Sequence, residues 1–166
     1  MIVWNKALAV VHQLENMHVS LSSPWDAMSY RRGAPYKPMM MLAVMDGMRE
    51  AVFDDASLVV LNDWLQHRYA QYIALCDDAL HNHPRIPFVH LSYEPFWRLV
   101  PCAPYAHVDT DWDLRSEKAF TQHIAGATLD WLLLRMIYDP QWYGILRYAI
   151  IQRYFVNDVA RRCWSV

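Results

Sequence analysis

Apolar positions recur with a helical period along most of this chain. Residues 4–16 carry one apolar stripe at spacings of three and four, which predicts an amphipathic helix. Residues 38–52 are almost uniformly apolar and rich in helix-forming side chains, so a helix buried on all sides is expected there. Asn62, a residue type that favours the helix N-cap, precedes a third amphipathic segment that is expected to end near Cys76.

The last third of the chain predicts three further helices. Ser116 has the side chain of an N-cap and is expected to begin a short helix that ends at Ile124. Residues 128–138 and 140–154 predict two longer helices. The second of these opens with proline, whose missing N–H would be unpaired at the first helical position anyway.

Residues 87–100 follow a different pattern, in which the side chains alternate with a period of two. This alternation predicts an antiparallel β-hairpin with its turn at Glu94-Pro95. Residues 57–60 are expected to form a short strand or a turn. The remaining segments are predicted to be loops: 18–36, 77–85 and 101–115. The fold class predicted from these elements is α+β, mainly helical, with a small antiparallel hairpin or sheet.

The composition indicates a single folded domain over residues 1–166, because the chain has neither an internal repeat nor an interior linker. Hydrophobic residues make up 55% of the sequence, which excludes a disordered chain. No apolar run is long enough to cross a membrane, and the N-terminal residues do not resemble a secretion signal. Three widely spaced cysteines fit reduced thiols, so a cytoplasmic location is expected.

The net charge of −2 means that nucleic-acid binding would require a local basic face rather than an excess of positive charge. The acidic residues gather in other segments, such as 54–55, 77–78 and 109–113. The basic residues form three clusters: Arg31, Arg32 and Lys37; His81, His83 and Arg85; and Arg147, Arg153, Arg161 and Arg162. This segregation permits a nucleic-acid face.

The first of these clusters lies directly before the apolar segment, in the sequence Arg31-Arg32-Gly33-Ala34-Pro35-Tyr36-Lys37-Pro38. Pro38 suits the first turn of a helix. The exposed N–H groups of that turn, the helix dipole and the nearby cations would together attract an anion such as phosphate. The alternative interpretation is a basic surface loop before a buried helix.

Five short motifs then follow one another in a characteristic order. They are the Lys37-Pro38 helix start, Ile86-Pro87-Phe88-Val89-His90-Leu91, Phe96-Trp97-Arg98-Leu99-Val100-Pro101, the Gly126 to Asp130 segment, and a closing segment from Leu146 to Phe155. This series resembles the sulfur-binding domain of McrA-like, phosphorothioate-dependent HNH restriction endonucleases. The resemblance covers about residues 30–155.

The resemblance implies recognition of double-stranded DNA in which sulfur replaces one non-bridging phosphate oxygen. The implied sulfur pocket consists of Arg32, Ile86, Pro87 and His90, and the implied DNA-binding residues are Arg31, Arg32, Gly33, Tyr36, Lys37 and Arg85. The chain departs from the family at Ile86, where an aromatic residue is common, and at His90, where a small residue is common. It also carries Glu94-Pro95 where the family often has Asp-Gly.

The chain is expected to be a recognition domain and not an enzyme, with any HNH nuclease domain supplied in cis or in trans. The tripeptide His81-Asn82-His83 spells HNH, but a nuclease of that class needs histidines far apart in sequence. We interpret it as a polar loop able to touch phosphate. No metal set, cofactor site or nucleophile–base pair is visible. The main alternative is a helical protein–protein interaction module, and an enzyme with an unrecognised site ranks third.

Overall fold

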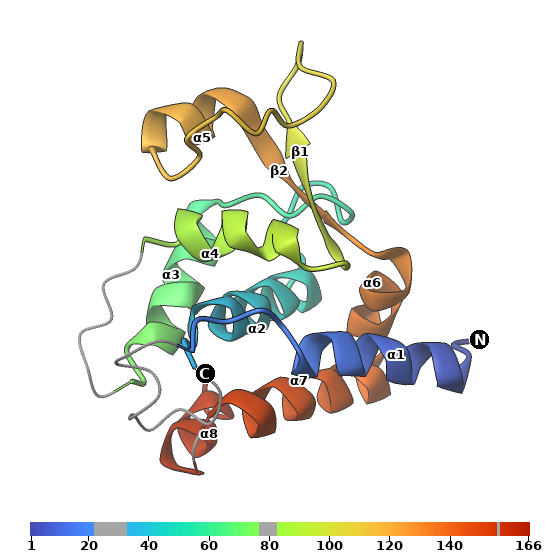
Figure 1. Ribbon diagram of the computed structural model, residues 1–166. Helices are drawn as coiled ribbons and strands as arrows, with labels where there is room; N and C mark the ends of the chain where they lie inside the picture. Colours follow the sequence, from blue (N-terminus) through green and yellow to red (C-terminus); the bar gives the residue numbers. More distant parts are fainter. Residues whose placement is uncertain (22–32, 77–82, 156) are drawn as a thin grey trace.

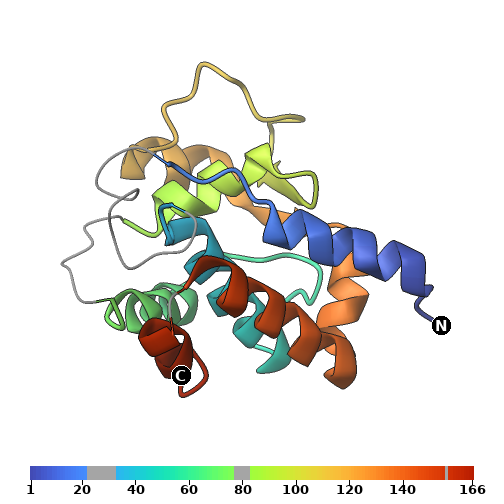
Figure 2. The same cartoon turned by 60° about the horizontal axis from the view of Figure 1, so that its bottom comes forward.

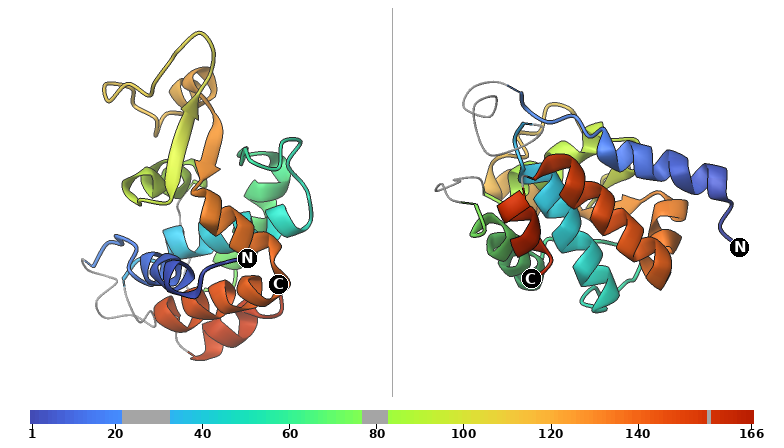
Figure 3. Two further views of the ribbon diagram at one scale, coloured as in Figure 1. Left: turned by 90° about the vertical axis from the view of Figure 1, so that its right-hand side faces the viewer. Right: turned by 90° about the horizontal axis from the view of Figure 1, so that it is seen from below.

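The computed structural model describes residues 1–21, 33–76, 83–155 and 157–166. These residues form eight α-helices, one short 3-10 helix and a two-stranded antiparallel sheet (Figure 1). The fold class is therefore α+β and mainly helical, as the sequence pattern predicts. The strands and the helix between them project from one end of the helical body (Figure 3).

The helix α2 (Tyr36–Arg49) lies at the centre of the helical body, and every residue from Lys37 to Met48 is buried. This burial on all sides is what the uniformly apolar segment predicts, although the helix begins two residues earlier than expected. The helices α1 and α7 run side by side, and α7 packs against α2 (Figure 2). The other long helices are α1 (Trp4–Glu15), α3 (Asp63–Ile73), α6 (Trp131–Tyr138) and α7 (Pro140–Tyr154).

The predicted caps Asn62 and Ser116 are confirmed, and so is the proline that opens α7. The Asn62 side chain accepts a hydrogen bond from the Leu65 N–H at the start of α3. Ser116 caps α5 (Glu117–His123) in the same way, and Pro140 occupies the first turn of α7. A further helix, α8 (Asn157–Cys163), has no counterpart in the prediction.

The first half of the predicted hairpin is wrong, because it is helical. Residues Arg85–His90 form α4, and Leu91–Tyr93 continue it as a 3-10 turn. Phe88 and Leu91 are both fully buried, and their spacing of three places them on one helix face. A short apolar run with alternating side chains fits a strand and a buried helix equally well, so the period alone could not decide.

The second half of that segment does form a strand, β1 (Trp97–Pro101), and Trp97 at its start is buried. Its partner is the distant β2 (Ile124–Leu129), with Leu99 opposite Ala127. The sequence did not predict β2, which lies where one helix was expected to end and the next to begin. The helix α6 accordingly starts only at Trp131.

The strand β2 could not be predicted from its composition, because its central residues are alanine and glycine, which have low β propensity. Val59 bridges to Ala127 from the side opposite β1, with both N–H to carbonyl distances at 2.8 Å. A Cβ on Gly126 would lie 2.4 Å from the Val59 carbonyl oxygen, so only glycine permits this approach. The segment predicted as a short strand or turn at 57–60 thus contributes a single bridge.

A buried carboxylate joins four helices in the interior. Asp46, which is 4% exposed, accepts hydrogen bonds from Arg147 Nη1 at 2.5 Å and from the hydroxyls of Tyr72 at 2.6 Å and Tyr143 at 2.7 Å. Arg147 also donates through Nη2 to the Cys163 carbonyl oxygen at 3.0 Å. Burial and the Asp46 carboxylate raise the pKa of Tyr143 to about 12. This network explains why an acidic residue occurs within an apolar helix.

Arg147→Met is expected to destabilise the fold by about 3 kcal/mol or more, because it removes the closer of the two cations at the buried Asp46 carboxylate and leaves only Arg68 Nη1, 3.4 Å away. Urea unfolding followed by circular dichroism measures the change. The control is Arg161→Met, which removes a cation from an exposed pair with Asp158 and should cost less than about 1 kcal/mol. Equal effects of the two substitutions would contradict a central role for the Asp46 network.

Candidate functional site

A small pocket forms where three segments of the chain meet. The segments are the stretch after α1, the start of α2, and α4. The pocket has a volume of about 230 Å³. Its lining residues are His18, Val19, Ser20, Ala34, Tyr36, Lys37, Ile86, Pro87 and His90.

Apolar side chains form much of the pocket wall. Ala34 and Pro87 are buried, whereas Ile86 is partly exposed. Pro87 occupies the first turn of α4, where the backbone N–H groups have no partner within the helix, so proline is tolerated there. The buried ring of Pro87 gives the pocket a fixed apolar surface.

Gly33 allows the segment before α2 to lie directly against the segment after α1, at one side of the pocket. Its φ of 76° lies in the left-handed region, and a Cβ there would come within 2.3 Å of the Ser20 carbonyl oxygen. The next residue, Ala34, donates its N–H to that oxygen at 2.8 Å. Gly33 is buried, so its role in the site is to join the two segments of the pocket wall.

An ion pair lies beside the apolar wall. Lys37 Nζ is 2.7 Å from Glu94 Oε1, and the side chains are 10% and 1% exposed. Glu94 also accepts the backbone N–H of His18 at 2.8 Å, and its second oxygen lies 3.3 Å from His18 Nδ1. Lys37 was expected to be a cation available to the DNA backbone. Instead its ammonium group is buried and its charge is balanced by Glu94.

A second, more open hollow of about 450 Å³ shares three lining residues with the pocket. It is lined by His18, Lys37, His90 and Tyr93. Tyr93 is 73% exposed, and Lys37 Nζ lies 5.7 Å from the centre of its ring. Burial lowers the pKa of His90, and the charges of Lys37 and Arg115 lower it further. His90 therefore enters the site as a neutral imidazole at neutral pH.

Five of the candidate residues line the pocket of about 230 Å³: Tyr36, Lys37, Ile86, Pro87 and His90. Arg85 lies outside it, where its guanidinium donates to the Arg115 carbonyl oxygen at 3.3 Å and lies 3.1 Å from His83 Nε2. Arg31 and Arg32 lie outside the described residues, as does His81.

Sequence reasoning missed Glu94 and four residues of the pocket lining, which are His18, Val19, Ser20 and Ala34. Glu94 was interpreted only as part of a hairpin turn. Its contacts with Lys37 and His18 join positions that are far apart in the chain, so no local pattern pointed to them.

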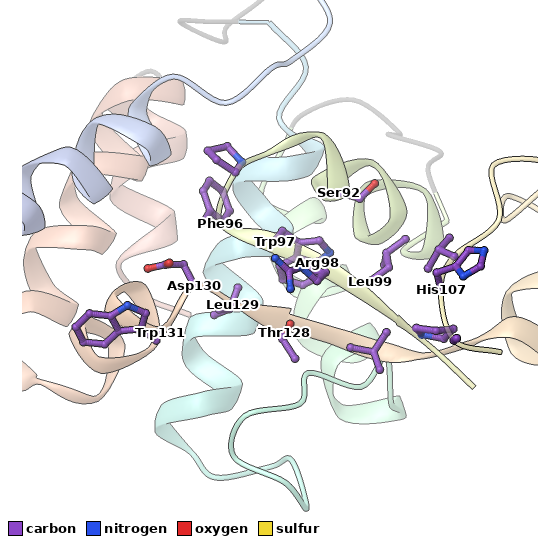
Figure 4. Close-up of a pocket in the computed structure, with 15 residues that line it drawn as sticks. Ser92, Phe96, Trp97, Arg98, Leu99, His107, Thr128, Leu129, Asp130 and Trp131 are labelled. Carbon is purple, nitrogen blue, oxygen red and sulfur yellow. The ribbon is translucent and has the colours of Figure 1, made fainter. Parts of the chain in front are cut away.

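A larger groove of about 830 Å³ follows β1 on another part of the molecule. Figure 4 shows its lining from Trp131 at one end to His107 at the other, with Arg98 and Thr128 between them. Trp131 is 59% exposed. Ala127 directs its N–H and carbonyl groups to Val59, on the side away from β1. Leu99 lies opposite Ala127 in β1, so its own N–H and carbonyl groups point away from β2, at the open edge of the sheet.

Among the described residues, no three histidine, cysteine or acidic side chains lie close enough to hold a metal ion. No helix in this part of the chain is both long and apolar enough to cross a membrane. The three cysteines carry thiols, and burial raises the pKa of Cys163 to about 12, so this thiol stays protonated.

No protein-family model matches this sequence, and no curated protein matches it. The pocket and the motifs that line it are therefore the features from which a function is inferred.

The imidazole of His90 is expected to titrate below 6.5 in the folded protein. Since the unfolded chain then binds the proton more readily, His90 should lower folding stability as the pH falls from about 6.5 through its folded pKa. Two-dimensional NMR of the ring protons measures the midpoint, with the urea-unfolded protein as the reference. A folded-state midpoint at or above the unfolded value would contradict the described surroundings of His90.

Proposed function

We propose that this domain binds double-stranded DNA carrying a backbone phosphorothioate and seats the sulfur in the pocket formed by α2 and α4. One observation carries the proposal. The residues selected by the resemblance come from two segments far apart in sequence, yet Tyr36, Lys37, Ile86, Pro87 and His90 line a single small pocket. In this proposal the chain is the recognition module of a type IV-like restriction system in the cytoplasm.

The chemistry of the pocket suits sulfur better than oxygen. Sulfur is larger and more polarizable than oxygen, and it is a poorer hydrogen-bond acceptor. The apolar wall of Ala34, Ile86 and Pro87 therefore accepts sulfur at small cost. An ordinary phosphate oxygen would lose its water there without gaining a partner, and an unpaired buried polar group costs about 1–3 kcal/mol. The preference thus comes largely from a penalty on the wrong ligand.

Attraction to the DNA backbone is assigned to basic groups around the pocket. Arg115 is 71% exposed, its Nε lies 3.1 Å from Asp113 Oδ1, and its charge lowers the pKa of His90 in the pocket lining. Arg31 and Arg32 precede the pocket segment in the sequence and are expected to add to this attraction. Because such contacts release counterions from DNA, binding should weaken steeply as the salt concentration rises.

The protein should bind a phosphorothioated duplex at least about tenfold more tightly than the same duplex with oxygen, a difference of about 1.4 kcal/mol. Fluorescence polarisation at matched salt measures both affinities. Ile86→Thr adds a hydroxyl donor to the pocket wall and should reduce the ratio of the two affinities. Val89→Thr adds the same hydroxyl on the same helix, outside the pocket lining, and should leave the ratio unchanged. Equal affinities for the two duplexes would refute the proposal.

The isolated chain is expected not to cut DNA in the presence of Mg²⁺, Mn²⁺ or Zn²⁺, because the described residues hold no metal-binding cluster. Incubation with a phosphorothioated supercoiled plasmid, followed by electrophoresis, checks this. A nuclease domain in cis or in trans would supply cleavage. Specific nicking that disappears in a His83→Ala variant would show that the chain is itself an enzyme.

A second candidate function is a protein-interaction module, and the groove along β1 favours it. The open edge at Leu99 offers backbone groups to which an extended peptide could pair as an added strand. Arg98 and Trp131 would give such a peptide side-chain contacts. Absence of binding to either duplex at low salt would favour this function over DNA recognition.

A further inference from the structure

The ion pair of Lys37 and Glu94 is an unusual feature in a pocket for an anionic ligand. A pocket that only had to attract phosphate would leave its cation uncompensated. Here the carboxylate is 1% exposed and lies 2.7 Å from the ammonium nitrogen. It is therefore a fixed negative charge beside the position that the DNA backbone would occupy.

Glu94 neutralises the positive charge of Lys37, and the neighbouring groups do not supply another positive charge in its place. His90 faces the same hollow and is held neutral by its surroundings. His18 Nδ1 lies 3.3 Å from the second carboxylate oxygen of Glu94, but the His18 side chain is 78% exposed and so lies at the outer side of the site. Tyr93 presents its ring to Lys37. The innermost part of the site is electrically balanced.

We propose that Glu94 is a specificity-determining residue, which makes the pocket reject ordinary phosphate by withholding the charge of Lys37. This inference rests on the proposed function. An oxygen that bears negative charge and has lost its water needs a cation or a hydrogen-bond donor, and the paired lysine supplies neither freely. Sulfur depends less on hydrogen bonds, so its binding is weakened less when the Lys37 ammonium is paired with Glu94.

Glu94 also has a structural contact, since it accepts the His18 backbone N–H at 2.8 Å. The test must separate this contact from the charge. Glu94→Gln does so, because the amide oxygen can still accept from His18 and from Lys37 while the negative charge is removed. The pocket then contains one uncompensated cation.

Glu94→Gln should tighten binding of the unmodified duplex about tenfold and of the phosphorothioated duplex no more than about threefold, so the preference for sulfur shrinks. The freed ammonium should also steepen the salt dependence for the unmodified duplex by about one unit. Fluorescence polarisation across a salt series measures both quantities. The matched control is Glu50→Gln, which removes a half-exposed carboxylate paired with Arg68, outside the pocket.

The double variant Lys37→Met with Glu94→Gln removes both charges. Replacing a buried pair by uncharged residues is often tolerated, so this variant provides a folded test even if Glu94→Gln alone does not fold. It should keep the wild-type preference for sulfur and the wild-type salt dependence, because a withheld charge makes no contribution to binding. A salt slope lower by about one unit would show that Lys37 contacts DNA despite Glu94, and would overturn the inference.

The outcomes distinguish the two proposals. If the wild-type protein binds both duplexes equally, the proposed function fails. If the wild type prefers sulfur and Glu94→Gln leaves the ratio unchanged, or weakens both ligands equally while circular dichroism stays native, the role of Glu94 is overturned and the sulfur pocket stands.

Discussion

The carboxylate of Asp46 is the constraint on which the helical body depends. It is buried in α2 and receives hydrogen bonds from α3 and α7, and its arginine partner extends to the end of α8. Removing such a group from water is costly, and the hydrogen bonds from Tyr72, Tyr143 and Arg147 offset this cost. Hydrophobic burial makes the helices pack, and this network limits how they can pack.

The same helix carries the pocket at its other end. Tyr36 and Lys37 begin α2, and Asp46 lies near its last turn. Because all residues between them are buried, α2 cannot shift without disturbing the core on every side. The pocket residues of α2 are therefore held in a fixed position. The rest of the wall comes from α4 and from the segment that Gly33 joins to the start of α2. A rigid wall is what discrimination between two atoms of different size requires.

The sequence was sufficient where one local signal dominates. The apolar segment of α2, the caps Asn62 and Ser116, and the proline that opens α7 could be interpreted from neighbouring residues alone. It was insufficient where the outcome depends on distant partners. The strand β2 is paired by β1 and Val59 from either side, and the Ala-Gly-Ala run at its centre does not favour a strand. The motif residues of the pocket could be named in advance, but Glu94 could not, because only the fold brings it to Lys37.

Each of the two charged residues within the buried part of α2 is compensated by a residue from another part of the chain. Asp46 meets Arg147, and Lys37 meets Glu94. The surroundings of these pairs differ, and so do their consequences. The first is enclosed by tyrosines and helices and serves stability. The second borders a cavity, where an incoming anion would compete with the carboxylate for the ammonium group. A buried ion pair that borders a ligand cavity thus makes affinity depend on how strongly the ligand needs the cation, and under the proposed function this is one respect in which sulfur and oxygen differ.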